Sequence, residues 1–230
     1  MCNVLKKIQK AFNILEKRVF VSEADFQHAF AMKLEKQFPG KVRLEYPIKK
    51  PEDIMTTKGD YIYADILIKD KEKNYIIELK YKTRSIKDVP ETDEDTELAC
   101  ELLKDQSAQD YGMYAFWADI SRTEKLVDTE QFGGGVCIFL TNDMSYCNKH
   151  ENTTFKQFSI SGGEHKRGER KWSKTDRCKD GYITKLERTL PVIPINNNYT
   201  FRWQDFRKVS ESKGGEFKYL YVEIPPKTKS

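Results

Sequence analysis

Two apolar runs joined by a short polar turn are the feature that most constrains this chain. Residues 61–68 read "YIYADILI", residues 74–81 read "NYIIELKY", and the polar turn "KDKEK" separates them. β-branched and aromatic residues on both sides of such a turn predict an antiparallel hairpin. Each predicted strand nevertheless carries charge inside its apolar run: Asp65 in the first, Glu78 and Lys80 in the second.

The predicted hairpin brings these charges together. Asp65 and Glu78 are almost equidistant from the centre of the turn, so antiparallel pairing places them nearly opposite each other, with Cβ atoms about 4.5–5.5 Å apart. Residues two apart on a strand share a face, so Glu78 and Lys80 stand side by side. Carboxylates in apolar surroundings are costly unless they are paired or bind a cation.

A divalent cation is one way to stabilise these carboxylates. Two carboxylates with a backbone carbonyl between them form the hard oxygen site that Mg²⁺ prefers, and Mn²⁺ is expected to substitute. Such a metal lowers the pKa of a bound water and stabilises charge on a phosphoryl oxygen. Lys80 would position the water or neutralise the phosphate, and if it is desolvated its pKa falls and it shares in deprotonating the water. The simpler alternative is an exposed sheet face with ordinary mixed charge.

The elements around the hairpin follow the order helix, three strands, helix, strand. Apolar residues at three- and four-residue intervals predict helices, and Ser22 is placed to cap the second of them. The expected helices are residues 3–18, 22–38 and 98–126, and the expected strands are 42–48, 61–68, 74–81 and 136–141. Further strand-like runs lie at 154–160, 199–203 and 217–224.

This combination resembles the PD-(D/E)xK nuclease superfamily, which has the restriction-endonuclease-like fold. Asp65 in "YADILI" and Glu78-Leu79-Lys80 in "IIELKYKT" match its motif, with Ala64 in place of the proline that often precedes the aspartate. The resemblance implies an α/β (α+β) fold with a mixed central sheet flanked by helices and extra C-terminal strands. It implies one nuclease-like domain over residues 1–230, with a core at about 20–141 and an elaboration at about 150–230.

The resemblance also implies roles for individual residues. Asp65 and Glu78 would bind Mg²⁺, and Lys80 would be the catalytic lysine. Glu23 in "SEADFQ" occupies the place of an additional metal-linked acid, although an acid in a first helical turn is favourable whatever its function. Gln106 and Gln109 are the candidates for a polar residue that faces the active site, or else they lie on the surface of an ordinary amphipathic helix.

The expected function is therefore Mg²⁺-dependent hydrolysis of DNA phosphodiester bonds, and the resemblance allows a homodimer because many such enzymes dimerise to cut both strands. The alternative is a non-catalytic module of the same fold that binds nucleic acid or a protein partner. In the intact motif, Asp65, Glu78 and Lys80 are all present, which argues against the alternative.

A basic stretch at residues 165–179 is the candidate for phosphate contacts. The whole chain has 40 Lys and Arg against 36 Asp and Glu, so its net charge of +4 permits nucleic-acid binding without requiring it. His165 in this stretch is expected at the surface. The expected DNA-binding residues are Lys82, Lys166, Arg167, Arg170, Lys171 and Lys174.

Several classes of protein are disfavoured by the sequence. Charges interrupt every apolar stretch near the N-terminus, which argues against a signal peptide, and no run approaches the roughly 20 apolar residues of a membrane span. The five cysteines are scattered without a CxxC pair, so neither a zinc site nor a disulfide framework is indicated. We therefore expect a soluble cytoplasmic protein with no membrane partner.

Overall fold

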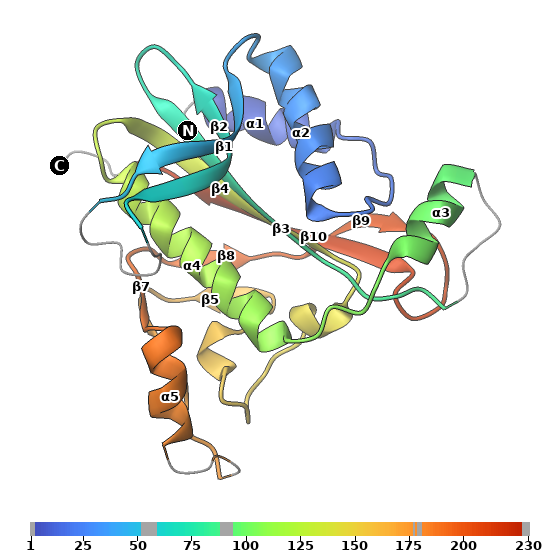
Figure 1. Cartoon of the computed structure of the whole chain (residues 1–230), viewed down its shortest axis with the longest axis vertical. Helices are drawn as coiled ribbons and strands as arrows, with labels where there is room; N and C mark the ends of the chain where they lie inside the picture. Colours follow the sequence, from blue (N-terminus) through green and yellow to red (C-terminus); the bar gives the residue numbers. More distant parts are fainter. Residues whose placement is uncertain (1–2, 52–58, 88–93, 177, 179–180, 227–230) are drawn as a thin grey trace.

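A six-stranded mixed sheet organises the chain (Figure 1). The computed structural model describes residues 3–51, 59–87, 94–176, 178 and 181–226. In the sheet β3 and β4 pair in parallel, and the other neighbouring strands pair antiparallel. In spatial order the strands are β1 (Val42–Lys49), β2 (Tyr61–Lys69), β3 (Asn74–Lys82), β4 (Phe132–Thr141), β10 (Glu216–Ile224) and β9 (Gln204–Lys208).

Helices cover both faces of this sheet. On β4, Val136 and Ile138 belong to the apolar cluster that contains α1 and α2, whereas the alternate residues Cys137 and Phe139 belong to the cluster that contains α4. Alternation of this kind means that both faces of β4 are buried. The expectation of a mixed sheet flanked by helices is confirmed. The helices are α1 (Asn3–Asn13), α2 (Glu23–Gln37), α3 (Glu94–Leu102), α4 (Gln109–Val127) and α5 (Tyr182–Thr189).

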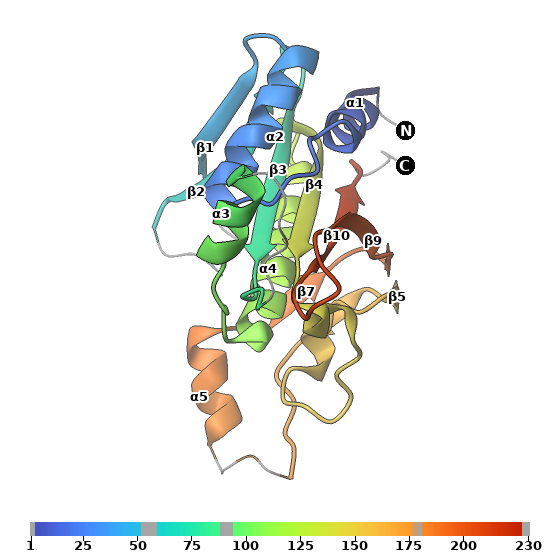
Figure 2. The same cartoon turned by 90° about the vertical axis from the view of Figure 1, so that its right-hand side faces the viewer.

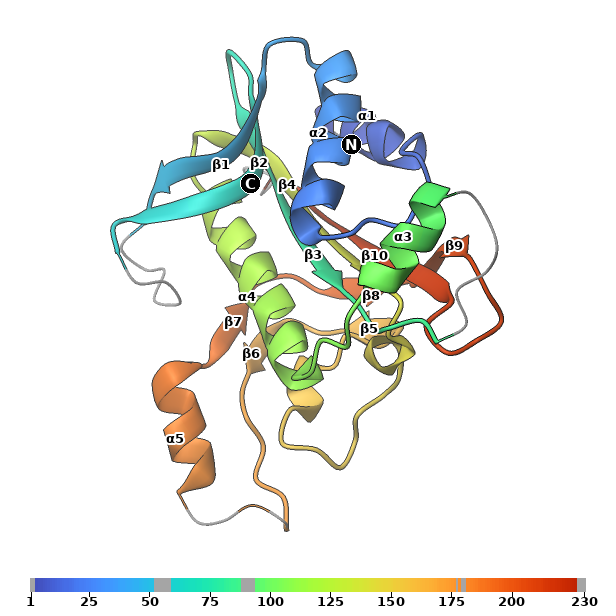
Figure 3. The ribbon, with the colours of Figure 1, turned by 45° about the vertical axis from the view of Figure 1, so that its right-hand side comes forward.

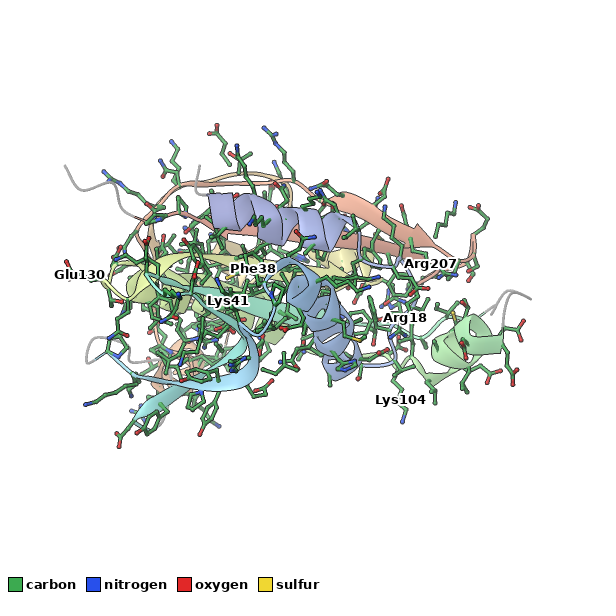
Figure 4. The ribbon with its side chains drawn as sticks, turned by 90° about the horizontal axis from the view of Figure 1, so that it is seen from above. Arg18, Phe38, Lys41, Lys104, Glu130 and Arg207 are labelled. Carbon is green, nitrogen blue, oxygen red and sulfur yellow. The ribbon has the colours of Figure 1, made fainter. Side chains whose placement is uncertain are left out.

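Interactions between residues close in the sequence hold the N-terminus of α2, and the sequence predicts its cap. Ser22 is the N-cap and its hydroxyl accepts a hydrogen bond from Asp25 N at 3.1 Å, as predicted. The Asp25 carboxylate in turn pairs with Arg18 and accepts from Val21 N at 3.1 Å. Arg207 on β9 donates to Lys17 O at 2.9 Å, and Arg18 and Arg207 lie close together beside α3 in Figure 4. These contacts fix where the first turn of α2 meets the sheet.

Two of the predicted helices have different bounds in the structure. The first helix ends at Asn13, five residues before the predicted end. The helix expected over residues 98–126 is two helices, α3 and α4, separated by residues 103–108. The last of these, Ala108, adopts a left-handed conformation with φ 68°. The intervening segment is bonded to the end of β3 instead of continuing as helix: Gln106 N donates to Thr83 O at 3.0 Å, and Thr83 Oγ1 donates to Lys104 O at 3.1 Å.

The C-terminal third of the chain departs most from expectation. The strand predicted at 154–160 is wrong: residues Lys156–Phe158 form a 3₁₀ turn, and the Phe158 carbonyl accepts from the Trp117 indole at 3.1 Å instead of from a neighbouring strand. A second 3₁₀ turn spans Met144–Cys147. The strand predicted at 217–224 is confirmed as β10, which lies next to β4.

Short strand pairs complete this region, which lies at the end of the molecule opposite α1 and α2 (Figures 1 and 2). The run predicted at 199–203 is a strand over three residues. The pairs are β5 (Gly163–His165) with β8 (Tyr199–Phe201), and β6 (Gly168–Arg170) with β7 (Ile193–Ile195).

Close packing of α4 on the sheet depends on Gly135 in β4. A Cβ added at Gly135 would lie 2.3 Å from Thr123 Cγ2 and 2.8 Å from Ile76 Cγ2. We therefore expect Gly135→Ala to lower the free energy of unfolding by about 1–3 kcal/mol, as overpacked cores do. Gly162→Ala is the control, because its nearest contact would be 3.7 Å, an ordinary van der Waals distance. Urea denaturation of both variants tests this, and equal stability of the two would contradict it.

Candidate active site

The β2 and β3 strands separate at Asp65. Their ladder runs from Lys69 opposite Asn74 to Ile66 opposite Ile77, and its register places Asp65 across from Glu78, as the sequence predicts. At the next donor of β3 the partner is a side chain: Leu79 N donates to Asp65 Oδ2 at 2.6 Å. Asp65 therefore replaces the backbone acceptor that β2 would otherwise supply.

Glu23 at the start of α2 repeats this arrangement one step further along β3. Tyr81 N donates to Glu23 Oε2 at 2.6 Å. Because a buried backbone N–H needs an acceptor, two successive donors on this edge of β3 are satisfied by carboxylates. Glu23 thus points toward the hairpin, and its role as a metal ligand stays a prediction.

Gln27 adds a contact that the sequence did not predict. Its Nε2 donates to Asp65 O at 2.6 Å and to Glu45 Oε1 at 2.7 Å. Glu45 has φ 47°, an unusual value for a residue within a strand, at the position of β1 that lies beside Asp65. Gln27 follows Glu23 by four residues, so the two share a helix face. That spacing is the signal by which Gln27 could have been found.

Glu78 points toward α4 and is almost fully buried, with 2% of its surface exposed. The guanidinium of Arg122 lies 3.1 Å from Glu78 Oε2 and also contacts Asp119 Oδ1 at 2.6 Å. The other carboxylate oxygen, Glu78 Oε1, is buried and has no hydrogen-bond partner within the described part of the chain. A buried acceptor of this kind is costly unless something binds it.

Lys80 lies on the same face and is held by α4 as well. Its Nζ is 2.8 Å from Asp119 Oδ2 and 3.3 Å from Leu79 O. Asp119 and Arg122 were missed at the sequence level. Their signal is an acid and an arginine three residues apart within the mostly buried helix α4, where charges need partners.

The charges in this cluster do not balance. Four carboxylates (Glu23, Asp65, Glu78 and Asp119) face two cations (Lys80 and Arg122), so the fully ionised cluster has a formal charge of −2. Burial raises the pKa of Asp65 to about 6, in spite of the nearby Lys80 ammonium. Burial, with the neighbouring Asp119 and Asp65, also raises the pKa of Glu78 against the effect of Arg122. Both acids are thus easier to protonate than ordinary carboxyl groups.

The expectation that desolvation lowers the pKa of Lys80 is wrong. Burial alone would lower it, but the Asp119, Asp65 and Glu23 carboxylates outweigh burial and raise the pKa of Lys80 well above its usual range. Lys80 therefore keeps its proton at neutral pH. It can supply positive charge, and it is not a proton acceptor.

The two candidate glutamines lie apart from this cluster. Gln109 Nε2 donates to Asp143 Oδ2 at 3.0 Å at the start of α4, and Gln106 precedes that helix with an exposed side chain. Gln109 and Asp119 are ten residues apart, about 15 Å along a helix axis. The structure does not bring either glutamine to the carboxylates.

The basic stretch is only partly free for phosphate contacts. Lys166 and Arg167 line an open pocket of about 510 Å³, while the Arg170 guanidinium stacks 4.5 Å from the Trp117 ring centroid. The expectation that His165 lies at the surface is wrong, because its half-buried ring packs between Phe201 and Trp117 at centroid distances of 4.4 and 5.5 Å. The lysines of this group with exposed side chains are Lys166, Lys171 and Lys174, and Lys82 is half-buried at the end of β3.

No protein-family model, no curated protein and no solved structure matches this chain. Within the described ranges, no three His, Cys, Asp or Glu side chains are grouped so that they could hold a metal ion. None of the described helices has both the length and the apolar character that crossing a membrane requires. Any role for the carboxylate cluster therefore has to be argued from its own geometry.

The raised pKa of Asp65 predicts how stability depends on pH. The pKa of Asp65 is about 6 in the folded protein and 3.8 ordinarily, so folding takes up a proton between these pH values. The stabilisation that results is fully present below about pH 4 and is lost as pH rises through 6. We expect the free energy of unfolding in EDTA to fall by on the order of 2 kcal/mol over this range. The raised pKa of Glu78 contributes in the same sense, so Asp65→Asn should make the fall smaller in urea titrations without abolishing it.

Asp70→Asn is the matched control for this measurement. Asp70 is partly exposed and its hydrogen bond to Lys41 lowers its pKa, so its contribution to stability is present at higher pH and is lost as pH falls. The control variant should keep the decline seen in the wild-type protein. Parallel stability profiles for the wild type and Asp65→Asn would contradict the prediction.

Proposed function

We propose that this chain is a Mg²⁺-dependent nuclease of the PD-(D/E)xK type that hydrolyses DNA phosphodiester bonds. The observation that carries the proposal is the convergence of Asp65, Glu78 and a protonated Lys80 where β2 parts from β3, with a buried Glu78 oxygen that has no hydrogen-bond partner within the described residues. The order α2, β1, β2, β3, α4, β4 supports a restriction-endonuclease-like core, with α3 inserted and β10 and β9 added to the sheet.

The residues fit a hard divalent cation. Mg²⁺ is bound in proteins by one or two carboxylates and keeps several waters, so a set of three acidic side chains is not needed. Asp65 and Glu78 are the candidate carboxylate ligands, and the carbonyl oxygen of Leu79, the residue after Glu78, is a third oxygen. The formal charge of −2 on the cluster favours a doubly charged ion. A bound divalent ion would supply activation of water and stabilisation of charge on the phosphate.

The protein groups have separate tasks in this proposal. Lys80, held by Asp119 and fully protonated, would neutralise charge that develops on the scissile phosphate. Arg122 already contacts Asp119 at 2.6 Å, so it can balance that carboxylate while Glu78 binds the cation. Leu79 N fixes the Asp65 carboxylate, and Gln27 fixes the Asp65 backbone.

A non-catalytic nucleic-acid-binding or protein-binding module is the second candidate. The observation that favours it is that charges of the cluster already neutralise one another: Arg122 pairs with Glu78, and Lys80 pairs with Asp119. If these pairs persist when divalent ions are present, the cluster is a structural ion network with no metal chemistry. The homodimer suggested by the resemblance stays a prediction in either case.

Cleavage assays with site variants test the nuclease proposal. Purified protein with Mg²⁺ or Mn²⁺ should cut DNA, and Asp65→Ala or Lys80→Met should lower the rate at least about 10³-fold, because each removes charge stabilisation at the phosphate. Lys71→Ala in the exposed β2–β3 turn is the control and should cut at the wild-type rate.

Calorimetry distinguishes the two candidates. The nuclease proposal expects Mn²⁺ binding that is lost in Asp65→Ala, whereas the binding module expects none. Circular dichroism of each variant checks that the fold is retained. A folded wild-type protein that cuts neither single-stranded nor duplex DNA with either ion would rule out the nuclease.

A further inference from the structure

The β1 and β2 strands continue past the candidate site as a two-stranded ribbon. From Ala64 back to Tyr61, β2 pairs with β1 and not with β3: the pairs run from Tyr46 opposite Ala64 to Lys49 opposite Tyr61. Figure 3 shows this ribbon extending away from α2 and from the remainder of the sheet. One row of its side chains, which includes Ile48, Ile62 and Ala64, is buried.

The other row of the ribbon is exposed and aromatic. Tyr61 and Tyr63 are 54% and 59% exposed, and neither ring packs on another ring within the described residues. They alternate with the buried row at intervals of about 6.6 Å, and they lie two and four residues from Asp65 along β2. Exposed Pro47 and Lys49 lie directly opposite them on β1. The row is a strip of aromatic surface that ends two residues before Asp65.

Unpaired bases fit this strip better than a duplex does. A tyrosine ring stacks on the face of a base, and in a duplex those faces are already covered by neighbouring bases. Lys49 lies opposite Tyr61 on β1, where its ammonium would contact a backbone phosphate. Glu45, the acid of β1 nearest to this row, accepts a hydrogen bond from Gln27. Continuity with the cluster through Asp65 would direct a strand stacked here into the site.

We infer that Tyr61 and Tyr63 form a stacking platform for unpaired bases, so that the substrate of the candidate site is single-stranded DNA or an unpaired end. This inference rests on the proposed nuclease function for its biological meaning, although the platform itself can be measured as binding. A protein partner covering the same strip is the competing occupant.

Fluorescence anisotropy in EDTA measures the platform separately from cleavage. The probes are a labelled oligo(dT) of about 15 nucleotides and a blunt duplex of the same length. We expect Tyr61→Ala/Tyr63→Ala to weaken oligo(dT) binding at least about 30-fold, because each stacked base is worth roughly 1–3 kcal/mol. Duplex binding should change less than about 3-fold.

Two controls identify the ring as the source of the effect. Tyr61→Phe/Tyr63→Phe keeps the aromatic faces and should bind oligo(dT) within about 3-fold of the wild type. Tyr182→Ala removes a tyrosine of similar exposure on α5, far from the ribbon in Figure 1, and should bind as the wild type does. All of these side chains are exposed, and circular dichroism verifies that the variants fold.

The outcomes separate this inference from the proposed function. No oligo(dT) binding by the wild type, equal binding by the double alanine variant, or equal losses for single strand and duplex would each overturn the platform. A change in oligomeric state on size-exclusion chromatography without a change in DNA binding would assign the strip to a protein partner and overturn it too. Tyrosine-dependent binding without Mg²⁺- or Mn²⁺-dependent cleavage would retain the platform and reject the nuclease.

Discussion

The separation of β2 from β3 at Asp65 is the feature on which the candidate site depends. Separated strands leave backbone donors without partners, and here Leu79 N and Tyr81 N are satisfied by carboxylates from β2 and α2. Those hydrogen bonds draw Asp65 and Glu23 against β3, beside Glu78 and Lys80. The same separation frees the end of β2 to form the ribbon with β1. One departure from regular pairing thus produces both the acidic cluster and the exposed tyrosine strip.

Burial then determines the electrostatics of the cluster. Charges this far from solvent interact strongly. Removing one partner of a buried ion pair commonly destabilises the protein by more than the intact pair stabilises it. Asp119 is central because it contacts both cations, Lys80 and Arg122. The network keeps Lys80 protonated while the pKa values of Asp65 and Glu78 are raised. A cluster with excess negative charge, a fixed cation and a buried Glu78 oxygen that has no hydrogen-bond partner among the described residues is suited to binding a further cation.

The sequence predicted the hairpin and its register because those depend on local information. A short polar turn and strand alternation are enough to place Asp65 opposite Glu78, and a cap is enough to place Glu23. Asp119 and Arg122 were not predicted, because the face that α4 presents to β3 depends on packing between distant elements. The break at Ala108, the site of β10 next to β4 and the half-buried position of His165 have the same long-range origin.

The two candidate functions differ in one physical quantity, the free energy of the Glu78 carboxylate beside Arg122 compared with beside a divalent ion. Arg122 contacts one oxygen of Glu78 and leaves the other buried without a protein partner within the described residues, so the existing pair satisfies only part of that carboxylate. Asp119 offers Arg122 a second acceptor at shorter distance, 2.6 Å against 3.1 Å. Transfer of Arg122 toward Asp119 therefore releases Glu78 without leaving the guanidinium unpaired. That alternative partner is the physical reason to favour a site that binds metal over a closed structural network.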